Sequence, residues 1–235
     1  MARMTKIGGM ASATKAKLKR TDRRTIRNRK ALLNAAEKLI AEKGLEHATV
    51  DEITEAADLA KGTFYNYFDD KNQIAKELAF TIRGEIETEV AVSQAGIDDP
   101  AGRLAAGVCV FLRTVATAPA RAAVVAKMYG QWLRPEAAGN LALRKDLQDG
   151  YRVGRFSTAD LPSAVVMIVG VVQAGIIRGL ELAEWKALRK LALALSGLVL
   201  RALGLKWSEA QAVSAKTVAH VFDRNFEGVA HRRLP

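Results

Sequence analysis

The sequence offers little from which a catalytic or covalent site could be built. Its only cysteine is Cys109, which excludes an internal disulfide and fits a protein of the reducing cytoplasm. A lone cysteine is more typical of a small core residue than of a redox sensor, although both interpretations stay open here. The three histidines, His47, His220 and His231, lie far apart, with no cysteine or acid at metal-ligand spacing.

Known phosphate and nucleophile motifs are also absent. There is no glycine-rich phosphate loop and no G-x-S-x-G elbow. An enzymatic function therefore has no support in the sequence. We expect a cytoplasmic protein that is not an enzyme and that needs neither a metal nor a cofactor.

Proline and β-branched runs are scarce as well, which argues against an all-β fold. The chain has only five prolines in 235 residues, while the strong helix formers alanine and leucine dominate. We therefore expect an all-α protein. The longest uncharged run, 161–177, contains Pro162 and Gln173 and is short for a membrane span, so we interpret it as a buried helix. Residues 1–20 lack the apolar region of a secretory signal.

Positive charge is concentrated at the start of the chain. Residues 1–30 contain eleven lysines or arginines and one acid, Asp22, and so hold ten of the eleven net positive charges. We expect residues 1–21 to form a basic, disordered arm that contacts DNA phosphates. Two plainer interpretations stay open, a solvated tail that only keeps the protein in solution and an organelle presequence.

The stretch 49–71, TVDEITEAADLAKGTFYNYFDDK, is typical of two short helices joined by a tight turn. Thr49 and Glu52 have the spacing of a capping box, in which each side chain satisfies a free backbone N–H of the other. The turn falls at residues 58–60, where Asp58 tolerates backbone conformations that most residues avoid. Asp70 and Gln73 repeat the capping pattern at the start of a further helix.

The second of these helices, predicted over 61–68, has the character of a DNA-recognition helix. Phe64 and Phe68 are four residues apart and are expected to anchor one face in the core. The remaining side chains of this helix are expected to face DNA, because the second helix of a helix-turn-helix enters the major groove. We expect Thr63 and either Tyr65 or Asn66 at base edges, and Gly62 where the backbone approaches DNA. The residues expected at phosphates are Thr49, Lys61, Tyr67 and Lys71.

The segment 29–78 resembles the DNA-binding domain of TetR-type transcriptional regulators. The resemblance covers about the first third of the chain and rests on Ala36, Gly44, Thr49, Ile53, Ala56, Ala57, Lys61, Gly62, Thr63, Phe64, Tyr65, Asn66, Tyr67, Phe68 and Lys71. Asp58, Leu59 and Ala60 depart from the Gly, Val and Ser usual in that family. Ala60 lacks the hydroxyl that in the family often caps the second helix or contacts phosphate.

Helical patterns continue through the remaining sequence. A first helix is predicted over 22–43 and a long one after Asp70, in which Ile74, Leu78, Ile82, Ile86 and Val90 recur every four residues. Further helices are predicted near 101–117, 119–133, 141–156, 162–181, 184–203 and 208–226. We expect two domains, a helix-turn-helix domain over 22–69 and a helical regulatory and dimerisation domain over 70–235.

The helices near 162–181 and 184–203 are apolar over more than one face. The second apolar face has to be buried in the domain's own core or against another subunit. The resemblance implies a homodimer formed by the last long helix pair. The interface candidates are Gly170, Ala174, Leu188, Leu191, Leu195 and Leu198.

The resemblance to TetR-type regulators implies a ligand pocket, whereas the spacing of residues in the sequence does not show one. The candidates on the central helices are Phe111, Met128, Tyr129, Trp132, Met167 and Gln173, which ordinary core packing would equally explain. The predicted function is a repressor that binds a palindromic operator as a homodimer and responds to a small apolar or aromatic effector. The alternative is a DNA-bound interaction protein without an effector.

Overall fold

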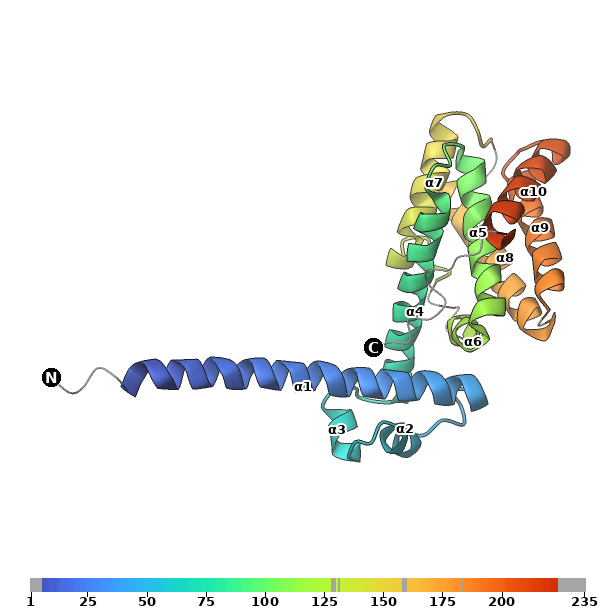
Figure 1. Ribbon diagram of the computed structural model, residues 1–235. Helices are drawn as coiled ribbons and strands as arrows, with labels where there is room; N and C mark the ends of the chain where they lie inside the picture. Colours follow the sequence, from blue (N-terminus) through green and yellow to red (C-terminus); the bar gives the residue numbers. More distant parts are fainter. Residues whose placement is uncertain (1–5, 128–129, 131, 158–159, 183, 224–235) are drawn as a thin grey trace. The chain divides into compact units, whose positions relative to one another are not determined.

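The computed structural model describes residues 6–127, 130, 132–157, 160–182 and 184–223, with side chains from residue 23 onward (Figure 1). Every regular element in these ranges is a helix, which confirms the all-α prediction. The chain divides into two compact units, Met1–Ala75 and Lys76–Pro235. The division lies inside helix α4 (Lys71–Gln94), whereas we had expected it between residues 69 and 70.

The N-terminal unit contains α1 (Lys6–Lys43), α2 (Val50–Ala56), α3 (Lys61–Tyr65) and the first residues of α4. Helix α1 begins at Lys6, whereas we had expected a helix from Asp22 onward and a disordered arm before it. No proline interrupts it, and residues 6–21 are rich in alanine and lysine, which favour helix. The core is formed by Leu32, Ala36, Ile40, Ile53, Phe64, Phe68 and Ile74, each at most 3% exposed.

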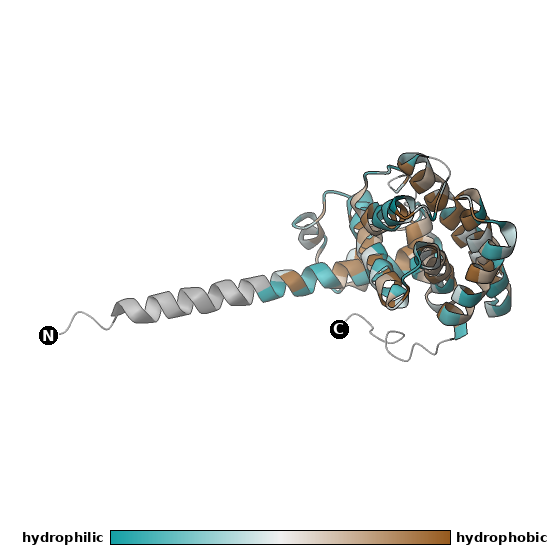
Figure 2. Cartoon of the chain, turned by 90° about the horizontal axis from the view of Figure 1, so that it is seen from above, coloured by the Kyte–Doolittle hydropathy of each residue, from teal (hydrophilic) through white to brown (hydrophobic). Residues whose placement is uncertain are grey.

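The C-terminal unit is built around α5. Its helices are α5 (Pro100–Thr117), α6 (Pro119–Lys127), η2 (Ala138–Asn140), α7 (Leu141–Arg152), α8 (Leu161–Leu182), α9 (Trp185–Ala202) and α10 (Trp207–Asp223). Helix α5 packs against α6, α7, α8, α9 and α10, which explains why most of its residues are buried. These helices carry hydrophobic residues interspersed with hydrophilic ones, as expected of amphipathic helices around a shared core (Figure 2).

Two predicted helices are longer than the observed ones. The helix predicted over 119–133 ends at Lys127, and the helix predicted over 141–156 ends at Arg152. The second ends because Gly154 has a left-handed backbone with φ of 68°, a conformation that glycine adopts without steric cost. The chain then turns back so that Phe156 packs directly on Gly150.

Small residues of α8 allow it to pack closely on α9 and α5. A methyl group added at Gly175 would lie 2.7 Å from Leu195 Cδ1, and one added at Gly179 would lie 2.7 Å from Leu188 Cδ2. Leu188 is fully buried by this packing, so the prediction that it lies at a subunit interface was wrong. The error arose because Leu188 shares its seven-residue spacing with Leu195, and this spacing does not show that Leu188 packs on Gly179 of α8.

Helix α8 is long and apolar enough to cross a bilayer by length and composition alone. In this protein it packs against α5, α6, α7 and α9. Ala164, Val165, Ile168, Val169 and Ile176 are buried in these contacts. Helix packing therefore accounts for the apolar residues on the buried side of α8, in agreement with its interpretation as a core helix.

Candidate DNA-binding head and effector cavity

The start of α2 is held by the predicted capping box. The backbone N–H of Glu52 donates to Thr49 Oγ1 over 3.3 Å, and the N–H of Thr49 donates to Glu52 Oε2 over 3.0 Å. Lys43, at the end of α1, also pairs with Glu52. The hydrogen bond from Lys43, followed by those from Thr49, lowers the pKa of Glu52 to about 2. Thr49 is exposed but already engaged in the cap.

The turn between α2 and α3 is tight because Asp58 takes a left-handed conformation with φ of 53°. Aspartate is among the non-glycine residues that tolerate this region best. The N–H of Leu59 then donates to the carbonyl of Thr54 over 2.9 Å, which closes the turn. Ala60 begins α3 without a side-chain cap, as expected from the missing hydroxyl.

Helix α3 is shorter than predicted, because it ends at Tyr65 with Asn66 as its C-cap. Phe64 and Phe68 are buried with ring centroids 5.5 Å apart, as predicted. The other positions are presented to solvent: Lys61, Gly62, Tyr65 and Asn66 are exposed, and Thr63 and Tyr67 are half-buried. The head therefore displays the predicted base-contacting residues from α3 and its C-terminal end.

Two lysines predicted to bind phosphate differ in their surroundings. Lys61 is exposed and forms an ion pair of 2.7 Å with Asp51, which raises its pKa. Lys71 is half-buried, and its ammonium group donates to the carbonyls of Leu45, Glu46 and Ala48 over 3.1, 2.9 and 3.1 Å. An ammonium group has three donors, so Lys71 is fully engaged with the loop between α1 and α2. The sequence did not predict this contact.

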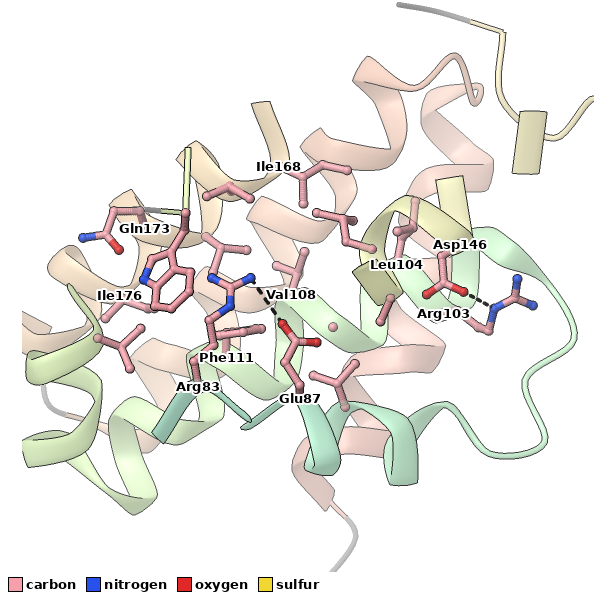
Figure 3. Close-up of a pocket in the computed structure, with 18 of the residues that line it drawn as sticks. Arg83, Glu87, Arg103, Leu104, Val108, Phe111, Asp146, Ile168, Gln173 and Ile176 are labelled. Atoms are coloured by element: carbon pink, nitrogen blue, oxygen red, sulfur yellow. Dashed lines mark hydrogen bonds and ion pairs between the residues drawn. The ribbon is translucent and has the colours of Figure 1, made fainter. Parts of the chain in front are cut away.

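A cavity lies in the C-terminal unit between α4, α5, α6, α7 and α8 (Figure 3). The empty space between these helices, including the part that is open to solvent, is about 660 Å³. The predicted residues Phe111, Trp132 and Gln173 line it. Met167 does not, because the cavity-lining positions of α8 between 168 and 176 share one helical face and Met167 lies on the opposite side, so that prediction was wrong. Met128 and Tyr129 lie outside the described residues.

The cavity wall also carries charged residues that the sequence analysis missed. At one end Arg83 Nη2 donates to Glu87 Oε1 over 3.2 Å, to the carbonyl of Gly139 over 2.9 Å and to Asn140 Oδ1 over 3.0 Å. The Arg83 guanidinium carbon lies 4.5 Å from the Trp132 ring centroid and 5.5 Å from that of Phe111. Burial lowers the pKa of Arg83 and raises that of Glu87, while their mutual attraction opposes both shifts.

A second charged group lies at the other end of the cavity (Figure 3). Arg103 Nε donates to Asp146 Oδ1 over 2.6 Å, and Gln94 Nε2 donates to Asp146 Oδ2 over 2.8 Å. Arg103 Nη2 also reaches Asp149 over 3.2 Å. Arg83 and Glu87 are two of several charged residues on α4, so the sequence neither singled them out nor indicated their partners.

Exposed apolar residues form a stripe on each of α8 and α9. On α8, Val166, Gly170, Ala174 and Ile177 follow one helical face, and Val166 and Ile177 are 40% and 50% exposed. On α9, Leu191, Leu195 and Leu198 share a face, and Leu198 is 52% exposed. Five of the six predicted interface residues thus keep some exposed surface, Leu188 being the exception.

Cys109 lies inside α5 and is fully buried. Burial raises the pKa of its thiol to about 12, so the reactive thiolate is not formed near neutral pH. Within the described residues, no group of three or more histidine, cysteine or acidic side chains is placed to hold a metal ion.

Family models match most of the chain. Residues 32–78 match the model described as bacterial regulatory proteins, tetR family, and residues 99–216 match the tetracyclin repressor-like C-terminal domain. The second match alone covers half of the chain. The protein belongs to the TetR family. The matched TetR segments contain α2, α3 and the cavity helices α5, α6, α7 and α8, and the protein is accordingly a transcriptional regulator.

Curated TetR relatives agree with this assignment. An uncharacterized HTH-type transcriptional regulator of Mycobacterium tuberculosis strain H37Rv is 29% identical over 116 residues, covering 49% of this chain and 55% of the relative. YvdT of Bacillus subtilis, also an uncharacterized HTH-type regulator, is 44% identical over 48 residues, or 20% of this chain and 25% of the relative. The matches thus span about half or less of the length of these relatives.

Solved TetR-like structures match over more of the chain. RolR in complex with resorcinol is 26% identical, with a TM-score of 0.61, covering 83% of this chain and 96% of RolR. The fatty acid degradation regulator FadR of Bacillus halodurans is 21% identical, with a TM-score of 0.58, covering 76% of this chain and 97% of FadR. The FadR match shows a shared fold.

Proposed function

We propose that this protein is a cytoplasmic repressor that binds a palindromic DNA operator as a homodimer and is released by a small apolar or aromatic effector. It has no enzymatic role in this proposal. The observation that carries it is the path of α4, a single helix that starts in the DNA-binding head at Lys71 and lines the cavity from Arg83 to Gln94. RolR, which has the same fold, is described in complex with resorcinol.

In the proposed DNA complex α3 enters the major groove. Thr63, Tyr65 and Asn66 contact base edges, while Lys61, Tyr67, Thr49 and the basic start of α1 contact phosphates. Gly62 permits close approach of the backbone. Lys71 has a different role, since its three N–H donors are engaged by carbonyls. It contributes by holding the loop before α2 against the start of α4.

The proposed dimer uses the exposed stripes of α8 and α9. TetR-family regulators act as dimers, and an apolar stripe left exposed in one chain is a suitable surface for a second copy. Two α3 helices then meet successive major grooves, about 34–36 Å apart. Effector binding favours a dimer whose heads have the wrong spacing, and it can do so only if the effector binds that state more tightly.

Operator release by a compound is the direct test. The operator is first selected from random DNA with the full-length protein, and a compound library is then screened by thermal shift. We expect at least one compound to raise the melting temperature and to reduce operator affinity, because a ligand of the non-binding state stabilises it by mass action. If no compound of any charge class changes the melting temperature or the operator affinity, the proposal of an effector is refuted. The protein is then better described as a DNA-bound interaction protein without an effector.

The basic start of the chain should contribute affinity that depends on salt. Residues 2–20 contain six lysines or arginines and no acid. Deleting them should leave the fold intact but weaken operator binding most at low salt, with a less steep dependence of log affinity on log salt. A full-length variant with glutamine at those six positions should behave in the same way. Equal affinity of all three proteins at every salt concentration would contradict this role.

A further inference from the structure

The charged groups of the cavity wall balance one another. Arg83 pairs with Glu87, and Arg103 pairs with Asp146, so that two guanidinium groups face two carboxylates. Arg103 has a further acidic partner in Asp149. A ligand with a net charge would lose its hydration here without finding an unpaired opposite charge among the described residues of the wall, and such burial is costly. The wall therefore favours an uncharged ligand.

Glu87 keeps one carboxylate oxygen open to a ligand. Its Oε1 accepts a hydrogen bond from Arg83 over 3.2 Å, whereas Oε2 accepts none from the residues that the structure describes. The Glu87 side chain is 24% exposed, so that a ligand can reach it. Figure 3 shows the carboxylate in the cavity between Arg83 and Asp146, with the second oxygen turned away from Arg83. Burial raises the pKa of Glu87, but the attraction of Arg83 opposes this shift and favours the ionised form, which can only accept hydrogen bonds.

The positively charged donors of the same wall are more closely engaged. Arg83 is only 9% exposed, and its guanidinium carbon lies 4.5 Å from the ring centroid of Trp132 and 5.5 Å from that of Phe111, so that aromatic rings cover much of it. All three side-chain nitrogens of Arg103 donate to protein oxygens. Glu87 is therefore the charged group of the wall that a ligand reaches most easily, and it offers an acceptor.

The rest of the cavity wall is mainly apolar. Aliphatic side chains of α5 and α8 line the space beside the charged pairs, among them Leu104, Val108, Ile168 and Ile176 (Figure 3). A surface of this kind binds a mainly apolar molecule by removing its surface from water. A ligand that suits the whole wall is thus an apolar body with one hydrogen-bond donor placed at Glu87.

We infer that the effector is an uncharged phenol or alcohol whose hydroxyl group donates a hydrogen bond to Glu87 Oε2. This inference rests on the proposed function, because it takes the cavity as the effector site. A protonated amine is also a donor, but it would bring a third positive charge close to Arg83 in a wall whose charges already balance. A carboxylate is excluded by the same balance and by repulsion from Glu87.

Three neutral probes of similar shape test the hydroxyl group: 2-naphthol, 2-methylnaphthalene and 2-methoxynaphthalene. Only 2-naphthol can donate a hydrogen bond, whereas 2-methoxynaphthalene keeps the oxygen atom without its hydrogen. We expect 2-naphthol to bind the full-length protein about tenfold more tightly than either of the other two probes, because a hydrogen bond to a charged acceptor is stronger than one between neutral groups. Binding is measured by calorimetry at pH 7.

Two charged probes on the same ring system test the charge of the effector. They are 2-naphthoate, an anion at pH 7, and 2-(aminomethyl)naphthalene, a cation at pH 7. We expect each to bind about tenfold or more weakly than 2-naphthol, because the wall has no unpaired charge among its described residues to compensate either of them.

The variant Glu87→Gln identifies the acceptor. Its amide can keep one oxygen for Arg83 while its NH2 group takes the place of the free oxygen, so that the wall presents a donor at this point. We expect the preference for 2-naphthol over 2-methoxynaphthalene to fall below about twofold. Binding of 2-methylnaphthalene should stay within about twofold of the wild-type affinity, which reports that the cavity is intact. Glu89→Gln is the matched control and should keep the wild-type order, because Glu89 lies on the same helix and pairs with Arg113 but does not line the cavity.

Several outcomes would overturn the inference. They are equal binding of the three neutral probes to the wild-type protein, binding of either charged probe as tight as that of 2-naphthol, binding of no probe, or a wild-type preference retained in Glu87→Gln. The order of the probes on the wild-type protein decides the matter even if the variant does not fold. The proposed function is judged separately by operator release in the compound screen. A charged compound, or one without a hydroxyl group, that releases the operator would retain the proposed function and overturn only the effector class.

Discussion

Replacing Leu198 with aspartate should convert an operator-binding dimer into a folded monomer that binds operator weakly. Leu198 is 52% exposed on α9, so the change does not disturb the core of the single chain. In the proposed dimer it would bury an unpaired charge at a cost of several kcal/mol, enough to weaken dimerisation on the order of a hundredfold or more. Sedimentation and operator titration measure the two effects, and circular dichroism confirms the helical fold.

The choice of Leu198 follows from the packing of α9. Leu195 lies against Gly175 of α8, so a charge there would disturb the fold as well as the interface. Val153→Asp is the matched control, since Val153 is 61% exposed and lies outside α8 and α9. If Leu198→Asp remains dimeric and binds operator normally, the subunits meet elsewhere.

Replacing Lys71 with methionine should weaken operator binding about tenfold without changing its salt dependence. Methionine keeps most of the side-chain length but cannot donate to the carbonyls of Leu45, Glu46 and Ala48. We expect the protein to lose on the order of 1–3 kcal/mol of stability, because charged hydrogen bonds to these carbonyls are removed. Thermal unfolding and operator titration at several salt concentrations give both quantities.

Lys61→Met is the matched comparison for Lys71. Lys61 is exposed and forms an ion pair with Asp51, and an exposed ion pair contributes little to stability. As a phosphate contact, its removal should lower the salt slope by about one unit and leave unfolding unchanged. If Lys71→Met instead lowers the slope by one unit and unfolds like the wild-type protein, Lys71 is a phosphate contact, as the sequence alone predicted.

Local sequence patterns determined the helices and the head. The capping box of Thr49 and Glu52, the left-handed turn at Asp58 and the buried pair Phe64 and Phe68 all depend on residues within four positions of one another. The helical propensity and periodicity of the chain likewise predicted every long helix, although Gly154 ended one of them early. Such features can be predicted from the sequence, because residues that are close in sequence are also close in space.

Only the tertiary structure decided the partners of the charged residues and the burial of the leucines. Arg83 meets Asn140 across 57 positions, and Lys71 meets Leu45 across 26. Leu188 and Leu198 look alike in the periodic pattern, yet one is fully buried and the other half exposed. Periodicity gives the face of a helix but not the element that covers it, because that depends on how distant helices pack together. The cavity arises at this level.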